Sequence, residues 1–162
     1  MTTTQPTGRW VIVVSFLLAF LLAGIPLPGE LQRFRPDWVT MVLIYWCMAL
    51  PHRIGIGVGW AVGLLLDIGR GALLGQHALA LGVVAYLTVQ TYRRIRVAPL
   101  WQQAFSVLAL LLIEQILIFW ISGVIGYPPR DWWYLAPAVG GMLLWPLLFV
   151  ILRDARRYFQ VS

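Results

Sequence analysis

The sequence predicts an all-α membrane protein, folded as a bundle of six transmembrane helices. Two observations carry this prediction. Of the 162 residues, 60% are hydrophobic and only 11% are charged, whereas soluble domains are about half apolar and about a quarter charged. Six apolar segments, separated by short stretches rich in proline, glycine and arginine, fill nearly the whole chain. We therefore expect a single integral membrane domain over residues 1–162, with no soluble domain beside it.

The first expected helix covers about residues 10–27, directly after Arg9. This apolar run would be about 27 Å long, close to the thickness of the hydrocarbon core of a bilayer. A signal peptide is the alternative interpretation, but the run is long and Leu22-Ala23-Gly24 makes a weak cleavage site. We favour a retained first transmembrane helix because five more apolar segments follow it.

The second expected helix, about residues 36–50, is short for a full crossing. Pro36 suits the first helical position, and Asp37 beside it favours the positive end of the helix dipole. A length of about 22 Å does not span the hydrocarbon core. Because Tyr45 and Trp46 carry polar groups that need partners, we expect burial among neighbouring helices rather than local thinning of the membrane.

Four further helices complete the expected bundle. The turn Pro51-His52-Arg53, the glycines from Gly69 to Gly75, the cluster Arg93-Arg94-Ile95-Arg96 and a loop at 126–131 separate them. The arginine cluster could recruit a cytoplasmic partner, but a role as a topology anchor is sufficient to explain it, and we favour that role. The segments predict helices over about residues 54–70, 76–92, 100–123 and 132–152.

The arginines predict the orientation of the bundle. Six crossings put both termini on one side, and eight of the twelve basic residues, all arginine, fall on that side. The positive-inside rule then places the N and C termini in the cytoplasm. The cytoplasmic set is Arg9, Arg53, Arg93, Arg94, Arg96, Arg153, Arg156 and Arg157, and the outer set is Arg33, Arg35, Arg70 and Arg130. An aromatic belt at the expected interfaces agrees, formed by Trp10, Trp38, Trp101, Trp132 and Trp133.

Four ionisable residues inside the apolar segments form a candidate polar intramembrane site: Asp67, Arg70, His77 and Glu114. Asp67 and Arg70 lie one helical turn apart, either as a substrate or proton site or as a pair whose charges compensate each other. We favour the structural pair, which would lie near the outer interface. Glu114 has no basic neighbour on its own helix, so we expect it to be protonated or to reach Arg70 or His77 across the bundle. Functional and structural roles stay open for Glu114.

Three glycines spaced by four form a candidate helix-packing seam in the third helix: Gly55, Gly59 and Gly63. On a helix they fall along one stripe and allow a second helix to approach backbone to backbone. We favour packing inside the bundle over a subunit interface.

Motifs of enzyme chemistry are absent from the sequence. There is no HExxH, GxSxG or P-loop motif and no carboxylate pair on one helical face. Cys47 is the only cysteine, so no internal disulfide is possible, and no Cys/His spacing suggests a metal site. The arginines lie at segment ends rather than along one face, which argues against nucleic-acid binding. We expect no catalytic residue, no cofactor and no metal.

Several short stretches, in their order and spacing, resemble the MreD family of bacterial rod-shape proteins, above all its proteobacterial members. The resemblance covers nearly the whole chain. The matching stretches are Gly8-Arg9-Trp10, Phe34-Arg35-Pro36-Asp37-Trp38, Tyr45-Trp46, Ala49-Leu50-Pro51-His52-Arg53, Leu66-Asp67 with Gly71 and Leu74-Gly75, Trp101-Gln102-Gln103, and Leu144-Trp145-Pro146.

This resemblance implies a function that composition does not show. It implies a multi-pass inner-membrane scaffold that acts with MreC, with the actin-like MreB, with the glycosyltransferase RodA and with a class B penicillin-binding protein in side-wall peptidoglycan synthesis. It also implies a fold similar to the substrate-binding subunits of energy-coupling-factor transporters. That kinship supplies the alternative, a subunit that binds a small molecule or lipid in an outward-facing pocket. A ligand pocket needs several convergent polar groups, and their scarcity here favours the scaffold.

Overall fold

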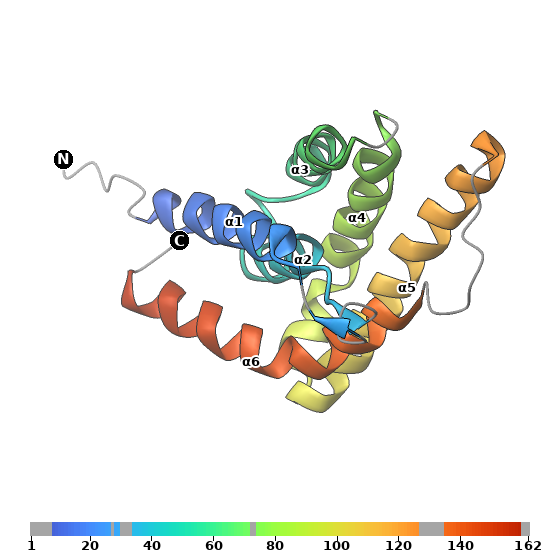
Figure 1. Cartoon of the computed structure of the whole chain (residues 1–162). Coiled ribbons are helices and arrows are strands. Elements are labelled where there is room, and N and C mark those ends of the chain that lie inside the picture. The colour runs from blue at the N-terminus through green and yellow to red at the C-terminus, as the bar shows by residue number, and fades with distance from the viewer. Residues whose placement is uncertain (1–7, 27, 30–33, 72–73, 127–134, 160–162) are drawn as a thin grey trace.

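The computed structural model describes residues 8–26, 28–29, 34–71, 74–126 and 135–159. Over these residues the chain forms six helices, and four of them pack around the second one (Figure 1). The all-α class and the six helices are confirmed. The helices are α1 (Arg9–Gly24), α2 (Trp38–Ala49), α3 (Ile56–Arg70), α4 (Gln76–Val97), α5 (Leu100–Ile125) and α6 (Ala136–Tyr158).

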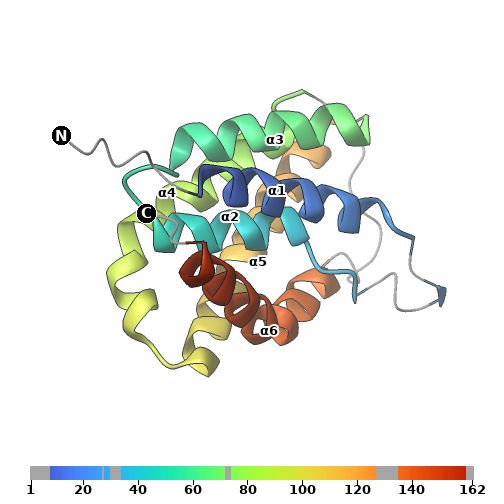
Figure 2. The same cartoon turned by 90° about the vertical axis from the view of Figure 1, so that its left-hand side faces the viewer.

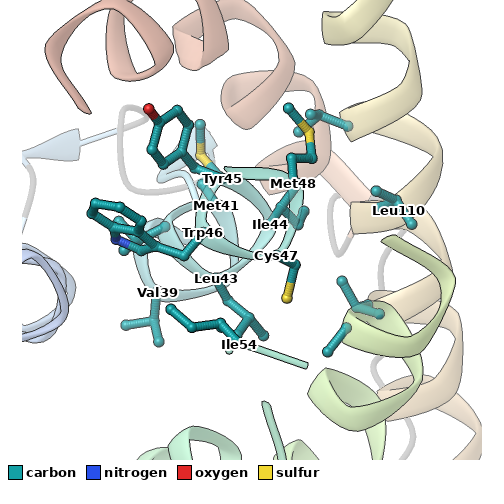
Figure 3. Packing of buried hydrophobic residues seen from close by; sticks show 14 of the residues in the cluster. Val39, Met41, Leu43, Ile44, Tyr45, Trp46, Cys47, Met48, Ile54 and Leu110 are labelled. Atoms are coloured by element: carbon teal, nitrogen blue, oxygen red, sulfur yellow. The ribbon is translucent and has the colours of Figure 1, made fainter. Parts of the chain in front are cut away.

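Helix α2 is the core of the molecule. Every residue from Val39 to Ala49 is buried, and the side chains point outward from the helix axis on all sides (Figure 3). With 12 residues it is about 18 Å long. The expectation that this short helix is buried rather than lipid-exposed is therefore confirmed. It packs against α1, α4, α5 and α6, so its apolar side chains have protein partners on every face.

Helices α3 and α4 form the closest pair in the bundle. A Cβ atom on Gly59 would lie 2.8 Å from the Leu81 carbonyl oxygen, which real Cβ atoms do not approach. On Gly63 it would lie 2.5 Å from the backbone nitrogen of Ala78. At Gly55, by contrast, it would make only an ordinary contact with Val89, at 3.8 Å. Two of the three seam glycines thus let the backbones of α3 and α4 meet.

The helix ends differ from the expected ones. Helices α2 and α3 begin later than expected, at Trp38 instead of 36 and at Ile56 instead of 54. Helix α5 ends at Ile125 instead of 123, and α6 continues past 152 to Tyr158. Helix α1 ends at Gly24, because Ile25 is extended, rather than at the expected residue 27, and α6 begins at Ala136 rather than at 132. Residues 27 and 132–134 themselves lie outside the described residues.

Helix α4 shows why the expected ends were wrong. It runs through the arginine cluster to Val97 rather than ending near residue 92. Hydropathy marks where a segment leaves the hydrocarbon, but arginine is a good helix former and continues the helix into water. The helix ends only where Pro99 forces the preceding residue, Ala98, into an extended conformation with φ −74° and ψ 151°.

Among the residues that the structure describes, two helices, α5 and α6, are long and apolar enough to cross a membrane, while α1 and α2 are apolar but shorter. The outer surface is also apolar. Large exposed side chains cover α1, with Val13, Leu17 and Leu21, and α5, with Phe105, Ile116 and Trp120. Apolar surface of this extent is typical of a membrane or protein interaction site rather than of a soluble monomer.

The start of α1 and the end of α6 lie together. The rings of Trp10 and Phe159 meet edge to face with their centroids 4.7 Å apart. In both views, α2 lies between α1 and α6 over the rest of their length (Figures 1 and 2). These two outer helices therefore meet at one end, and further along α2 packs against both of them.

Candidate functional site

Asp67 lies in the last turn of α3, and its side chain is fully buried. Gly71 ends the helix with a φ of +64°, and α4 begins after Gly75, whose φ is +101°. The reversal brings the first N–H groups of α4 onto the Asp67 carboxylate, which accepts from the Gly75 and His77 nitrogens, each at 2.9 Å. These N–H groups have no partner within their own helix. Asp67 therefore caps α4 from a different helix, at its positive dipole end.

His77 links Asp67 to Arg70. Its Nδ1 lies 2.7 Å from Asp67 Oδ1, and its Nε2 lies 3.2 Å from Arg70 Nη1. A guanidinium can only donate hydrogen bonds, so Nε2 accepts from Arg70 and the Nδ1 proton is donated to Asp67.

Arg70 has a second partner in Asp37, which occupies the residue before the first turn of α2 without a side-chain capping hydrogen bond. The Arg70 Nη2 and Asp37 Oδ1 atoms are 4.0 Å apart, and the Arg70 side chain is 44% exposed. The expectation that Asp67 and Arg70 compensate each other directly is wrong. One turn of helix separates the two side chains by about 60° in direction, so Asp67 faces α4 while Arg70 reaches toward α2.

Glu114, on α5, is fully buried, and its Oε1 accepts a hydrogen bond of 2.9 Å from Thr40 Oγ1. The expected hydrogen-bond partners, Arg70 and His77, are not used. The side chain of Asp37 interacts with Glu114, and Glu114 Oε2 and Asp37 Oδ1 are buried without a hydrogen-bond partner among the described residues. Two neighbouring carboxyl groups can satisfy such oxygens by sharing one proton.

Together these residues form a polar chain across four helices, from Thr40 and Glu114 through Asp37 to Arg70, His77 and Asp67. The structure brings all four expected site residues into this chain. Sequence reasoning missed Asp37 and Thr40 as members. Thr40 is the only threonine in an otherwise apolar helix, which is the signal that could have found it. The helix dipole is a sufficient reason for an aspartate at position 37, so the sequence gives no separate signal that Asp37 belongs to the polar chain.

A second feature, the apolar groove, lies where α1 and α6 are separated. It has a volume of about 250 Å³. Its floor is α2, and its walls are leucines of α1 and α6. The one hydroxyl in its lining, Ser15 Oγ, donates to the Ile12 carbonyl oxygen and accepts from Trp46 Nε1. The lining consists of Ser15, Leu18, Ala19, Leu22, Trp38, Val42, Leu144, Leu147, Leu148, Ile151 and Leu152. With its hydroxyl satisfied, the groove offers only apolar contact.

Comparison with known proteins shows the family of the chain. The model of the rod shape-determining protein MreD family matches residues 4–155. The rod shape-determining protein MreD of Haemophilus influenzae is 33% identical over 150 residues, which cover 92% of this chain and 93% of that protein. No solved structure matches the chain. The match of a family model over nearly the whole chain, with a relative of the same length, shows that this chain belongs to the MreD family of rod shape-determining proteins.

Proposed function

We propose that this chain is a non-enzymatic scaffold of the elongation complex, which spans the bacterial inner membrane six times with both termini in the cytoplasm. It binds an MreC-like single-pass membrane protein directly. Through that protein it works with MreB, RodA and a class B penicillin-binding protein to guide side-wall peptidoglycan synthesis. Family membership supports the role in cell shape, and the apolar groove supports the scaffold mechanism.

The occupant of the groove is the single transmembrane helix of the partner. A groove that offers only apolar contact at membrane depth suits an apolar helix, whose leucine-sized side chains insert between facing helices. Within the groove, Leu18 on α1 and Leu147 and Ile151 on α6 are more than half exposed, so no helix of this chain covers them. A helix docked there would cover the faces of α1 and α6 that no helix of this chain covers.

The polar chain supports the scaffold in a different way. A binding subunit needs polar groups directed into a cavity, whereas the Asp67 carboxylate is occupied by α4 and His77 by its two neighbours. These groups hold α3 and α4 together and tie α2 to them. The alternative function, binding of a small molecule or lipid in an outward-facing pocket, has support only from the two unpartnered oxygens of Glu114 and Asp37.

The experiment is co-purification of the MreC-like partner with groove variants in mild detergent. Leu147→Trp adds bulk to a groove residue that is 59% exposed, so it should leave the fold intact and reduce the recovered partner several-fold. Ile116→Trp is the matched control, because Ile116 lies on α5 and is 54% exposed. Equal recovery of the partner with both variants would refute the groove as its binding site.

A further inference from the structure

A basic pocket lies at the end of the bundle where α2, α4 and α6 finish. It has a volume of about 470 Å³. Four guanidinium groups line it, one from Arg96 on α4 and three from Arg153, Arg156 and Arg157 on α6. The floor is formed by Tyr45 and the last residues of α2, together with Phe149. Neither the polar chain nor the apolar groove uses any of these arginines.

The pocket carries an excess of positive charge. Asp154 forms an ion pair with one of the pocket arginines. Its Oδ1 lies 3.7 Å from Arg153 Nε, and its side chain is 66% exposed. This distance is too long for a hydrogen bond, and Arg153 Nε is buried without a hydrogen-bond partner among the described residues. On α6, positions 153, 156 and 157 lie on one face, where like charges destabilise a helix unless an anion compensates them.

The floor of the pocket is closely packed and contains a hydroxyl group. The Tyr45 ring is 2% exposed and meets Phe149 edge to face, with centroids 5.7 Å apart. The Arg153 guanidinium lies 5.8 Å from the centre of the Phe149 ring. Tyr45 directs its hydroxyl toward α6 (Figure 3), where it lies in the electrostatic field of Arg153, Arg156 and Arg157. The arginines therefore converge on a polar group at the bottom of the pocket.

We propose that this pocket is a binding site for a phosphate group. Guanidinium forks match phosphate oxygens in bidentate geometry, and the Tyr45 hydroxyl adds a donor at the base. A role as topology anchors requires arginines on this side of the membrane but does not require them to share one pocket. The phosphate comes either from an anionic lipid headgroup or from a soluble phosphate compound. The inference is independent of the proposed scaffold function.

Native mass spectrometry of the full-length protein in detergent tests the proposal, with phosphatidylglycerol and inorganic phosphate as separate probes. The pocket variant is Arg153→Gln/Arg156→Gln. The control is Arg93→Gln/Arg94→Gln, which removes the same charge from two exposed α4 residues outside the pocket. Retention should fall about tenfold or more in the pocket variant, equivalent to about 1.4 kcal/mol, and should be unchanged in the control.

The two probes separate the sources of the phosphate. Retained lipid that inorganic phosphate does not displace identifies a headgroup site, whereas retention of inorganic phosphate alone identifies a soluble ligand. If the double pocket variant does not fold, Tyr45→Phe replaces it, since this change removes only the hydroxyl and should weaken retention several-fold. Equal loss of retention in pocket and control variants, or no retention by the unmodified protein, would overturn the proposal.

Discussion

At the scale of single residues, Asp67 shows how a buried charge can stabilise the fold. Its two oxygens accept from the backbone of Gly75 and His77 and from the His77 ring. Each of these donors would be buried without a partner if the carboxylate were removed, and an unsatisfied buried group costs about 1–3 kcal/mol. The charge thus stabilises the reversal between α3 and α4.

We predict that Asp67→Ala lowers the free energy of unfolding by about 3 kcal/mol or more, and that Asp67→Asn, which keeps one acceptor oxygen, loses less. Arg70→Ala should cost about 1 kcal/mol or less, because the side chain is 44% exposed. The double variant should be no more stable than Asp67→Ala, since Arg70 pairs with Asp37 and His77. Thermal unfolding in detergent measures all four. Recovery of stability in the double variant would show that the two charges compensate each other after all.

Glu114 allows a second prediction at this scale. Glu114→Gln preserves an acceptor for Thr40 and supplies a donor toward Asp37, so stability should change by about 1 kcal/mol or less. Glu114→Ala leaves a cavity and unpartnered groups, and should cost about 2–4 kcal/mol. Unfolding measurements on the two variants test these predicted stability changes. A loss with Glu114→Gln as large as that with Glu114→Ala would mean that the carboxyl itself is required.

Residue contacts also mark the limit of sequence reasoning. The ionisable residues of the polar chain stand out because charges are rare in apolar segments. Which residues pair with one another does not follow from the sequence, because Thr40 and Glu114 are 74 positions apart and only the packing of α2 against α5 brings them together. Local spacing suggested a pair between Asp67 and Arg70, but the third position along the helix turns the arginine toward another helix.

At the scale of helices, the α3–α4 contact depends on two glycines. A Cβ atom at either position would collide with α4, but with different residues of it. Gly63 faces the backbone at His77 and Ala78, and Gly59 faces Leu81 and Ala85. Backbone atoms cannot rotate away as side chains do, so this contact tolerates no added carbon. The stripe of small residues was visible in the sequence, whereas the position where the contact stops, short of Gly55, depends on the crossing of the two helices.

We predict that Gly63→Ala lowers the free energy of unfolding by about 1–3 kcal/mol through overpacking. The matched control is Gly57→Ala on the same helix, where a Cβ meets nothing within 4 Å. There alanine should be neutral or should stabilise the helix by about 0.5–1 kcal/mol. Chemical denaturation of both variants in detergent measures the difference, and an equal effect at the two positions would contradict the close approach of α4.

At the scale of the whole molecule, composition was sufficient to predict an all-helical fold with a buried second helix, because apolar content and segment length are properties of the sequence itself. The groove was not predictable, since it exists only where α1 and α6 separate around α2 (Figure 2). Its lining residues lie far apart in the sequence and individually look like ordinary lipid-facing leucines.

The orientation of the bundle gives a prediction at this scale. In a Cys47→Ala background, Arg94→Cys and Ser162→Cys should be protected from a membrane-impermeant thiol reagent in intact spheroplasts, and Pro129→Cys should react. Pro129 and Ser162 lie outside the described residues, so this expectation depends on the arginine distribution alone. Labelling of the cysteine at position 94 from outside the cell would contradict the proposed topology.

Site-specific photo-crosslinking in living cells tests the scaffold account most directly. A photoreactive phenylalanine analogue is placed at Leu18 on α1 or at Leu147 on α6, both in the groove, and at Ile116 on α5 as the control. The account predicts one crosslinked product with the MreC-like single-pass protein from both groove positions and none from Ile116. Crosslinks to that partner from Ile116 alone, or only to lipid from the groove, would contradict it.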